Sequence, residues 1–276
     1  MPKEYTYATW RTDKPKEDGF SHELISTDSK FLVEKGSNLD ELYALPFEGV
    51  DTIMKAIQRN VERIPNHEML GTRVGDKYEW MTYRDMINIA EHLSYGFVAL
   101  DMCPPVEAED KTWKFMGIQS KNRKEWVLTN LANMHQRITT VAFYDTLGPE
   151  ATRFVCNQTE LTTMSVSIDY IMKLSEMKIE DAKDTSPKMS KLVNLISFES
   201  GFTDEMRSKA EEAGITLYTM EEVIMKGREA QKNGGTSIQE SEPDDVYMFS
   251  YTSGTTGDPK GVKLTHKMIV GAAYAV

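Results

Sequence analysis

Apolar residues recur at helical spacing from residue 51 onward, whereas residues 1–44 are polar, mixed in charge and without a sustained period. A first helix is predicted from apolar positions that share one face: Ile53, Met54, Ile57, Val61 and Ile64. Asp51 is placed to cap this helix, and Pro65 to end it. Because residues 1–44 have no such periodic face, they are predicted to form an extended arm over the later core.

A hairpin and a longer helix come next. The segments "MLGTRV" and "KYEWMT" flank Gly75 and Asp76, a pair typical of a tight turn between two strands. Thr82 then opens a helix whose apolar positions stay in phase: Met86, Ile89, Ala90, Leu93, Phe97 and Leu100. Both elements precede the region in which strands and helices alternate.

Strand-like and helix-like segments alternate from residue 113 to residue 251. Strands are predicted at residues 113–119, 138–144, 162–168, 191–198, 215–218 and 245–251. The helices between them carry start and stop signals: Asn122 with Glu125 and Thr219 with Glu222 as capping boxes, Pro149 in a first turn, and Thr203 and Gly214 at the ends of one helix. Residues 231–245 have the composition of a surface linker. The alternation indicates an α/β fold with mostly parallel sheets covered by helices, in one domain at residues 45–276.

The composition is that of a globular and acidic protein. With 40% hydrophobic residues over 276 positions, the chain is long enough to bury a substantial core. A net charge of −11 argues against nonspecific nucleic-acid binding, which depends on clustered Lys and Arg, and against electrostatic attachment to anionic lipid. An anionic ligand would therefore need a local group of positive charges.

The cysteine and hydropathy patterns predict a cytoplasmic protein. Cys103 and Cys156 are far apart and lack metal-ligand spacing, so they support neither a disulfide framework nor a zinc site. The first twenty residues lack the apolar core of a signal peptide. No run reaches the roughly 18 apolar residues of a membrane span.

A stretch rich in glycine, hydroxyl and lysine side chains lies between the strand-like "DVYMFSY" and the apolar "MIVGAAYAV". Its glycines permit positive φ and a close approach of backbone N–H groups to a ligand. From residue 252 to residue 267, three lysines stand against one aspartate, and a helix predicted to start near Thr265 would add a positive dipole end. Phosphate is the anion that suits such a loop, in which Pro259 would stiffen the turn. The candidate site residues are Thr252, Ser253, Gly254, Thr255, Thr256, Gly257, Pro259, Lys260 and Gly261.

Two other interpretations of this loop need to be weighed. A Walker A loop is excluded by spacing, because Pro259 stands five positions after Gly254 and Val262 five after Gly257, where that motif needs a glycine before its lysine. A mobile surface turn has the same composition. Composition alone leaves the phosphate site and the surface turn open.

The order of residues in this loop goes further than its composition. "YTSGTTGDPKGV", followed by "LTH", resembles the phosphate-binding signature of the adenylate-forming superfamily, which includes acyl-CoA synthetases, luciferases and peptide-synthetase adenylation domains. "KNRKEW" resembles a second element of the superfamily. "YDTLGPEA", "EWMTYRDM" and "NQTE" are similar to segments of eukaryotic long-chain fatty acid CoA ligases. The resemblance covers roughly residues 42–276.

The resemblance implies a two-step reaction on small-molecule substrates. A fatty acid carboxylate attacks the α-phosphorus of ATP and releases pyrophosphate, and the thiol of coenzyme A then displaces AMP from the acyl-adenylate. ATP, Mg²⁺ and coenzyme A are the implied cofactors and co-substrates. Lys260, the hydroxyls of the loop and the backbone at its glycines would hold the β and γ phosphates. The resemblance also leaves room for peripheral association with the endoplasmic reticulum or another intracellular membrane.

The superfamily's adenine-stacking segment, its ribose-binding aspartate and a small C-terminal domain with a catalytic lysine follow the glycine-rich loop. None occurs before Val276, so no catalytic residue is assigned, and residues 45–276 are expected to be an incomplete N-terminal domain that is inactive alone. Two alternatives stay open. One is a non-catalytic nucleotide-binding or interaction module of this fold, and the other is an adenylate-forming ligase for a different acid.

Three further candidates have ordinary structural explanations. His266 is expected to be a local hydrogen-bond partner more often than a residue that orients the loop. Asp145 is expected to cap a helix. The acidic run at Glu240, Glu242, Asp244 and Asp245 is expected to be solvated and not to bind a metal.

Overall fold

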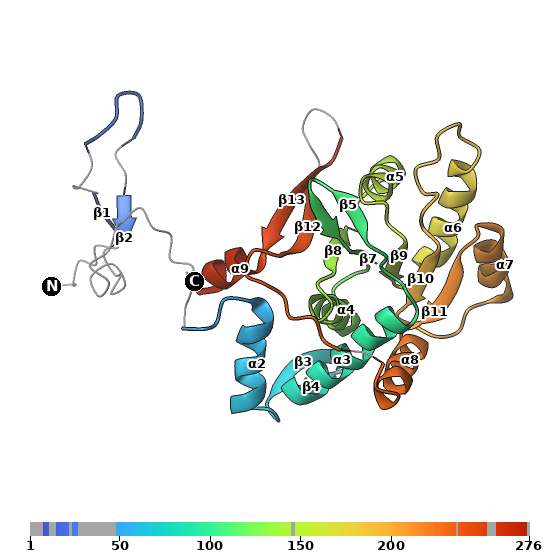
Figure 1. The fold of residues 1–276 in the computed structure, drawn as a ribbon, viewed down its shortest axis with the longest axis horizontal. Coiled ribbons are helices and arrows are strands. Elements are labelled where there is room, and N and C mark those ends of the chain that lie inside the picture. The colour runs from blue at the N-terminus through green and yellow to red at the C-terminus, as the bar shows by residue number, and fades with distance from the viewer. Residues whose placement is uncertain are drawn as a thin grey trace. The chain divides into compact units, whose positions relative to one another are not determined.

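The computed structural model of the chain describes residues 8–10, 15–21, 24–26, 48–144, 147–235, 237–252 and 258–274. The chain divides into two compact units, Met1–Tyr43 and Ala44–Val276. In the first unit, β1 (Ala8–Trp10) pairs antiparallel with β2 (Leu24–Ser26). The second unit holds the large sheet and its helices (Figure 1). The predicted packing of the N-terminal arm over the core stays a prediction.

A seven-stranded sheet lies at the centre of the second unit (Figure 1). Its strands, in the order in which they lie side by side, are β11 (Thr216–Thr219), β10 (Asn194–Ser197), β9 (Thr163–Val166), β7 (Phe115–Gln119), β8 (Thr139–Phe143), β12 (Val246–Thr252) and β13 (Lys260–Thr265). All neighbours are parallel except β13, which runs antiparallel to β12. The predicted α/β class with a mostly parallel sheet is confirmed.

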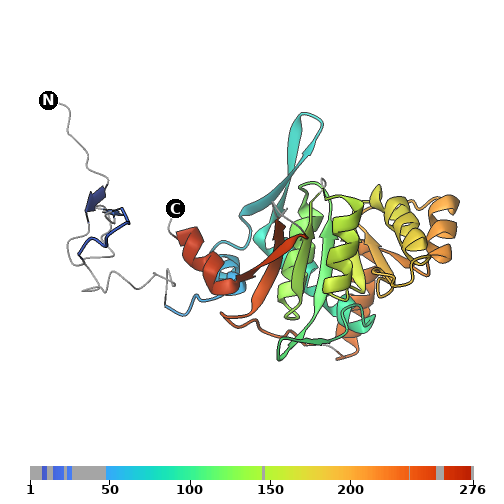
Figure 2. The same ribbon diagram turned by 90° about the horizontal axis from the view of Figure 1, so that it is seen from above.

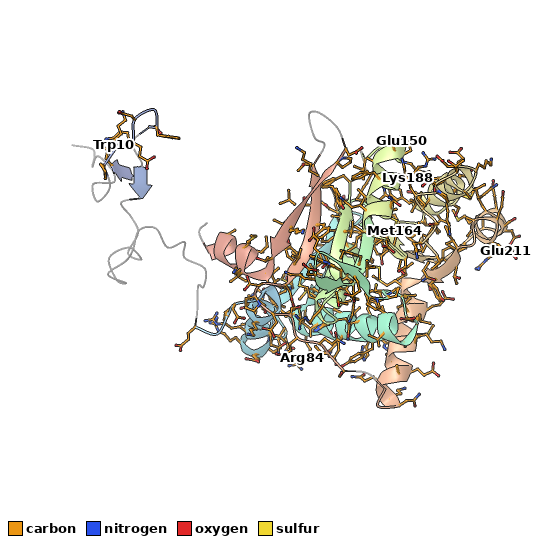
Figure 3. The ribbon with its side chains drawn as sticks, turned by 45° about the horizontal axis from the view of Figure 1, so that its top comes forward. Trp10, Arg84, Glu150, Met164, Lys188 and Glu211 are labelled. Carbon is orange, nitrogen blue, oxygen red and sulfur yellow. The ribbon has the colours of Figure 1, made fainter. Side chains whose placement is uncertain are left out.

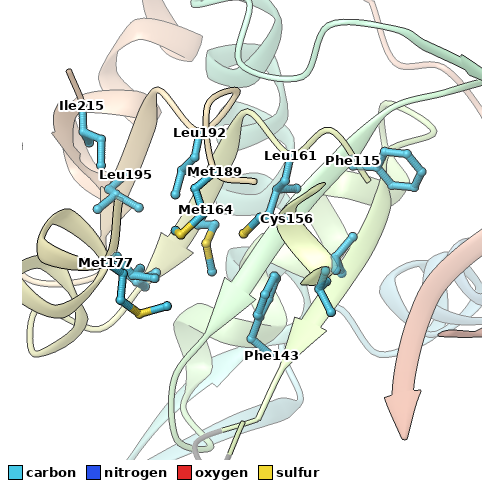
Figure 4. Close-up of a cluster of buried hydrophobic side chains, with 14 of the residues drawn as sticks. Phe115, Phe143, Cys156, Leu161, Met164, Met177, Met189, Leu192, Leu195 and Ile215 are labelled. Atoms are coloured by element: carbon cyan, nitrogen blue, oxygen red, sulfur yellow. The ribbon is translucent and has the colours of Figure 1, made fainter. Parts of the chain in front are cut away.

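Helices cover both faces of this sheet. The hydrophobic core on one face includes α5 (Pro149–Gln158), α6 (Tyr170–Asp181) and α7 (Asp204–Glu212). The core on the other face includes α3 (Tyr83–Ala99), α4 (Lys124–Met134) and α8 (Met220–Lys232). Figure 4 shows the first core, where Phe143 and Met164 of the strands meet Cys156 and Met177 of the helices.

The central strands are buried on both faces, which explains their sequence pattern. Every residue of β7, β8 and β9 is buried. Strands covered on both sides read as continuous buried runs and not as an alternation of polar and apolar positions. Figure 3 shows Met164 inside this body, whereas the exposed Glu150, Lys188 and Glu211 lie at its periphery.

Two glycines allow α3 and α8 to pack backbone against backbone. A Cβ added at Gly227 would lie 1.7 Å from the carbonyl oxygen of His92, and one added at Gly96 would lie 2.1 Å from that of Val223. Real Cβ atoms essentially never approach so closely, so both positions require glycine at this helix spacing. The pair of helices therefore depends on these two residues for its close approach.

Several predicted helix starts are confirmed. Thr82 caps α3 and Thr203 caps α7, in each case through the side-chain oxygen. Thr219 and Glu222 form the full capping box of α8, because Thr219 Oγ1 accepts from the Glu222 amide and a Glu222 carboxylate oxygen accepts from the Thr219 amide. Gly214, with φ of 64°, follows the end of α7.

Two predicted caps are wrong. Thr52, and not Asp51, caps α2 (Ile53–Arg63), while Asp51 forms an ion pair with Lys55 at 2.7 Å. Arg123, and not Asn122, occupies the N-cap of α4 and makes no capping bond with its side chain. In both places the acidic or amide residue that fitted the pattern stands one position too early. The helix α6 was not predicted, although its apolar residues recur at helical spacing.

Smaller elements lie around the sheet. The predicted hairpin is β3 (Glu68–Val74) and β4 (Lys77–Thr82), and it projects away from the large sheet (Figure 2). A second hairpin joins β5 (Val106–Ala108) to β6 (Lys111–Trp113), so Trp113 does not belong to β7 as predicted. The helix α9 (His266–Tyr274) follows β13.

The segment predicted as a surface linker is partly helical and partly held by hydrogen bonds to the end of α4. Residues 231 and 232 belong to α8. Beyond them, the Gln239 amide donates to the His135 carbonyl at 2.8 Å, and the buried Ser241 hydroxyl donates to the Met134 carbonyl at 2.8 Å. This segment is therefore held along the end of α4 before it enters β12.

Candidate phosphate-binding site

The glycine-rich loop joins β12 to β13, and its base lies at the carboxyl end of β12. Thr252 and Lys260 face each other as the last pair of this antiparallel ladder. In open α/β sheets, ligands bind outside the carboxyl ends of the parallel strands. The loop therefore starts at the edge of the sheet where a ligand is expected.

Five of the nine predicted site residues lie outside the described residues: Ser253, Gly254, Thr255, Thr256 and Gly257. Their role in binding phosphate stays a prediction. The other four, at positions 252 and 259–261, form the two ends of the loop.

The described ends of the loop present one hydroxyl, one ammonium group and, at Asp258, one carboxylate. Thr252 is exposed, and its hydroxyl lies 3.5 Å from the Lys260 carbonyl oxygen. Pro259 is half-buried. Lys260 is exposed and makes no ion pair with any residue in the described part of the chain. The Lys260 ammonium group is thus exposed at the base of the loop, while the Thr252 hydroxyl donates to the Lys260 carbonyl.

Gly261 has a packing role that the sequence did not reveal. It lies in β13 opposite Tyr251, and a Cβ added there would come within 3.2 Å of the Tyr251 ring. A contact of that length is tighter than most real ones, so a larger residue would displace the ring. Gly261 therefore lets Tyr251 lie flat against the hairpin.

The positive charge around the loop is smaller than the sequence predicted. Lys263 forms an ion pair with Glu109 and lies 5.4 Å from the centre of the Trp113 ring. Lys267 forms an ion pair with Asp244. Two of the three lysines are thus neutralised by carboxylates from other parts of the chain. Lys260 is left to stand against the exposed Asp258, so the described ends of the loop carry little net charge.

The predicted contribution of a helix dipole is wrong. The helix α9 starts at His266, but the six residues of β13 separate it from the loop, a distance of about 20 Å at ~3.4 Å per residue. The amide of His266 donates to the Asp245 carbonyl at 3.2 Å, and that of Lys267 to the Pro243 carbonyl at 3.0 Å. The N-terminus of α9 therefore lies at the opposite edge of the sheet, beside the start of β12.

The strand that carries the loop is anchored on both faces near its end. The Tyr251 hydroxyl donates to Gln158 Oε1 of α5 at 2.7 Å, and burial raises the pKa of Tyr251 to about 12. The hydroxyls of Tyr144 and Ser250 lie 2.8 Å apart. Because neighbouring residues of a strand point to opposite faces, these two bonds hold β12 from both sides. Sequence reasoning noted these partners only as part of the similar segments "YDTLGPEA" and "NQTE".

A second polar cluster ties together the carboxyl ends of other strands. Arg123 Nε donates to Glu125 Oε2 at 2.6 Å, and its Nη1 pairs with Glu199. The other oxygen of Glu199 accepts from the Ile168 amide at 2.9 Å, and the guanidinium lies 5.3 Å from the centre of the Phe198 ring. Glu125 therefore serves this ion-pair cluster and not the predicted capping box.

The remaining candidates do not join the loop. His266 is 1% exposed and lies at the far end of β13. Asp145 lies outside the described residues. In the acidic run, Asp244 pairs with Lys267 and Asp245 with Arg137, so these two carboxylates are engaged in ion pairs and are not merely solvated.

Two searches of the described residues bear on metals and membranes. Within residues 8–10, 15–21, 24–26, 48–144, 147–235, 237–252 and 258–274, no group of three or more His, Cys, Asp or Glu side chains is placed to hold a metal ion. Over the same ranges, no helix has the length and apolar content needed to cross a bilayer.

Solved structures share this fold. The adenylation domain of a carboxylate reductase from Mycobacterium chelonae superposes with a TM-score of 0.66 at 18% identity, over 82% of this chain and 36% of that one. The anthranilate CoA ligase AuaEII, solved in complex with anthranoyl-AMP, superposes with a TM-score of 0.58 at 16% identity, over 78% of this chain and 35% of that one. At these identities the likeness establishes the fold.

Sequence comparison adds the family. Fatty acyl-CoA synthetase B of Dictyostelium discoideum is 32% identical over 243 residues, which are 86% of this chain and 32% of the relative. Long chain acyl-CoA synthetase 4 of Arabidopsis thaliana is 30% identical over 82% of this chain and 32% of its own length. The chain thus spans about a third of the length of these relatives. The profile of one family, described as "AMP-binding enzyme", matches residues 57–276, so the chain belongs to the AMP-binding enzyme family.

Proposed function

We propose that this chain supplies the phosphate-binding part of a long-chain fatty acid CoA ligase, an enzyme that activates a fatty acid with ATP. The observation that carries the proposal is the position of the β12–β13 hairpin. Its loop starts at the carboxyl end of a parallel strand, and Lys260 at its base has no carboxylate partner among the described residues. The long-chain substrate is inferred from the names of the relatives at 25–32% identity.

In the proposed reaction, the fatty acid carboxylate attacks the α-phosphorus of ATP, and pyrophosphate leaves. The acyl-adenylate then passes its acyl group to the thiol of coenzyme A, and AMP leaves. Lys260 would hold the β and γ phosphates by charge-assisted hydrogen bonds, with the Thr252 hydroxyl as a second donor. Ser253–Gly257 are also proposed to bind these phosphates, because their sequence resembles the phosphate-binding signature of the superfamily.

Magnesium enters this proposal only as the ion that accompanies ATP. It would offset charge on the phosphates when it is bound. In the described ranges of the chain, no group of three or more His, Cys, Asp or Glu side chains is placed to hold a metal ion, so the proposal assigns no protein ligand to it. Association with an intracellular membrane likewise stays a prediction.

Binding of ATP to the 276-residue chain tests the role of the loop. In equilibrium dialysis with labelled ATP, the dissociation constant of Lys260→Ala should be at least about tenfold larger than that of the unaltered chain, because a charged partner of the phosphates is lost. Lys77, an exposed lysine in the β3–β4 hairpin, gives the matched control. Lys77→Ala should bind ATP like the unaltered chain. Equal binding by all three proteins would contradict the proposal.

A turnover assay separates the alternatives. Pyrophosphate release with ATP, Mg²⁺ and palmitate is expected to be absent from the 276-residue chain alone, because the superfamily's adenine, ribose and lysine elements are not among its residues. Release above the Lys260→Ala control would refute that expectation. A non-catalytic module would bind ATP without turnover even when these elements are supplied. A ligase for another acid would turn over with shorter or aromatic acids in preference to palmitate.

A further inference from the structure

A polar cavity lies at the amino ends of the parallel strands, whereas the glycine-rich loop lies at their carboxyl ends. Its volume is about 360 Å³, at the small end of the ~300–1,000 Å³ typical of ligand pockets. Residues at the amino ends of β8 and β12 line it, together with β6, Lys114 between β6 and β7, and the first residue of α9. We call it the amino-edge cavity, and its walls are Lys111, Thr112, Trp113, Lys114, Arg137, Ile138, Thr139, Gln239, Ser241, Asp244, Asp245, Val246, Tyr247 and His266.

The amino-edge cavity is separate from the candidate phosphate site. The two lie at opposite ends of β12, whose first residue, Val246, lines the cavity, and whose last residue, Thr252, begins the loop. Six residue steps at ~3.3 Å place them about 20 Å apart. A ligand in the cavity would therefore not contact a nucleotide held by the loop.

The carboxylates in the cavity wall are already engaged. Asp245 Oδ1 accepts from Arg137 at 2.8 Å, and its other oxygen accepts from the Glu242 amide at 2.8 Å. Asp244 pairs with Lys267. Neither carboxylate is left over to neutralise the two lysines of the wall.

Those two lysines lack a carboxylate partner within the described residues. The ammonium group of Lys114 contacts two neutral oxygens, Gln239 Oε1 at 3.0 Å and the Gln136 carbonyl at 3.3 Å. Lys111, on the rim, forms no ion pair with the described part of the chain. The wall thus carries uncompensated positive charge, although the whole chain has a net charge of −11.

A buried imidazole with one unpartnered nitrogen completes the wall. His266 is 1% exposed, its ring lies 5.7 Å from that of Tyr247, and its Nδ1 has no hydrogen-bond partner among the described residues. A buried polar atom without a partner is costly, and native proteins rarely retain one without a ligand, an ion or an ordered water. The ring thus lies in the cavity wall as a neutral polar group with one ring nitrogen that the described residues leave without a partner.

We propose that the amino-edge cavity binds a small organic or inorganic anion whose carboxylate or phosphate group lies between Lys111 and Lys114 and reaches toward the His266 ring. Positive charge without a counter-ion selects an anion and disfavours a metal cation. The neutral hydroxyl and amide groups of the wall suit the remaining oxygen atoms of such a ligand. Ordered water alone would satisfy His266 but would leave the two lysines uncompensated.

The test follows the side-chain signals of His266 by NMR in the 276-residue chain. Inorganic phosphate and citrate serve as the two probes, one for each anion chemistry, with chloride at matched ionic strength as the reference. Either probe should shift the His266 ring signals in a saturable way, at about millimolar concentration or below. Loss of these signals in His266→Phe assigns them.

Substitutions then locate the bound anion. Lys114→Met and Lys111→Met should each weaken the response at least about tenfold, while Lys114→Arg keeps the charge and should retain most of it. Lys77→Met is the control for the loss of an exposed lysine, and Lys260→Ala excludes an effect transmitted from the loop. Both should respond like the unaltered chain.

Two results would overturn the proposal. The first is that neither anion moves the His266 signals beyond the chloride reference, which would mean that the cavity holds water only. The second is an equal response in the unaltered chain and in Lys111→Met, a rim substitution that leaves the folded core untouched. A response to one probe alone would support the proposal and would assign the anion as phosphate or carboxylate.

Discussion

Replacing His266 by phenylalanine should make the stability of the chain less sensitive to acid. Burial lowers the pKa of His266 from 6.5 to about 4, and nearby Asp245 opposes this shift only in part. The unfolded chain therefore takes up a proton on this ring between about pH 6.5 and pH 4, whereas the folded chain does not. Stability from this group is fully present above about pH 6.5 and is lost as the pH falls toward 4.

The size of the effect follows from that difference. A difference of about 2.5 pKa units, at ~1.36 kcal/mol per unit, gives about 3 kcal/mol of unfolding free energy lost by about pH 4. The phenylalanine ring keeps the contact with Tyr247 and removes the unpartnered Nδ1. At neutral pH the substitution is therefore expected to be nearly neutral or slightly stabilising.

Urea unfolding between about pH 7.5 and pH 4.5 measures this, with the variant compared with the unaltered chain at each pH. Subtracting one curve from the other cancels the contributions of the acid-sensitive carboxylates and of His135 to the unfolding free energy, because these groups are present in both proteins. The exposed His67 gives the control, because His67→Phe should keep the slope of the unaltered chain. A constant difference between His266→Phe and the unaltered chain over this pH range would show that the ring is not buried as described.

Three substitutions test other parts of the structure by urea or thermal unfolding. Gly227→Ala adds a methyl group 1.7 Å from a carbonyl oxygen of α3 and should cost about 1–3 kcal/mol or more, whereas Gly235→Ala, with its nearest atom at 3.6 Å, should stay within about 0.5 kcal/mol. Equal effects would contradict the backbone contact. Thr219→Ala removes the capping box of α8 and should cost about 1 kcal/mol. Tyr251→Phe deletes the bond to Gln158 and should cost about 1 kcal/mol. An unchanged midpoint would mean that this anchor does not hold β12.

The sequence predicts the strands of the sheet well because each has a recognisable local sequence pattern. Each central strand is a short apolar run bounded by turn or cap residues, and the capping box at Thr219 fixes the start of α8. The order of the strands in the sheet cannot be predicted in the same way. β7 lies between β9 and β8 because of contacts between distant residues, which no local sequence pattern encodes. The wrong caps at Asp51 and Asn122 differ from the true ones by one position, which is as fine as such patterns allow.

The prediction was least accurate around the glycine-rich loop. The strand β13 is an edge strand with exposed lysines and an exposed Val262, so it buries too little to read as a strand. Because β13 was not predicted, α9 was expected to start beside the loop and not at the opposite end of the strands. The pairing of Lys263 with Glu109 joins residues 154 positions apart and cannot be read from sequence.

These corrections change what the loop needs in order to bind a nucleotide. With Lys263 and Lys267 neutralised and the helix end about 20 Å away, Lys260 is the remaining described cation at its base. One lysine offsets only part of the charge of a triphosphate. The rest of the binding energy would come from backbone N–H groups, whose approach the glycines permit. Binding of ATP should then depend on salt only about as steeply as a single charged contact requires, and much less than it would with three free lysines. The order of residues in "SGTTGDPKG", more than the number of its lysines, is accordingly what supports the proposed phosphate site.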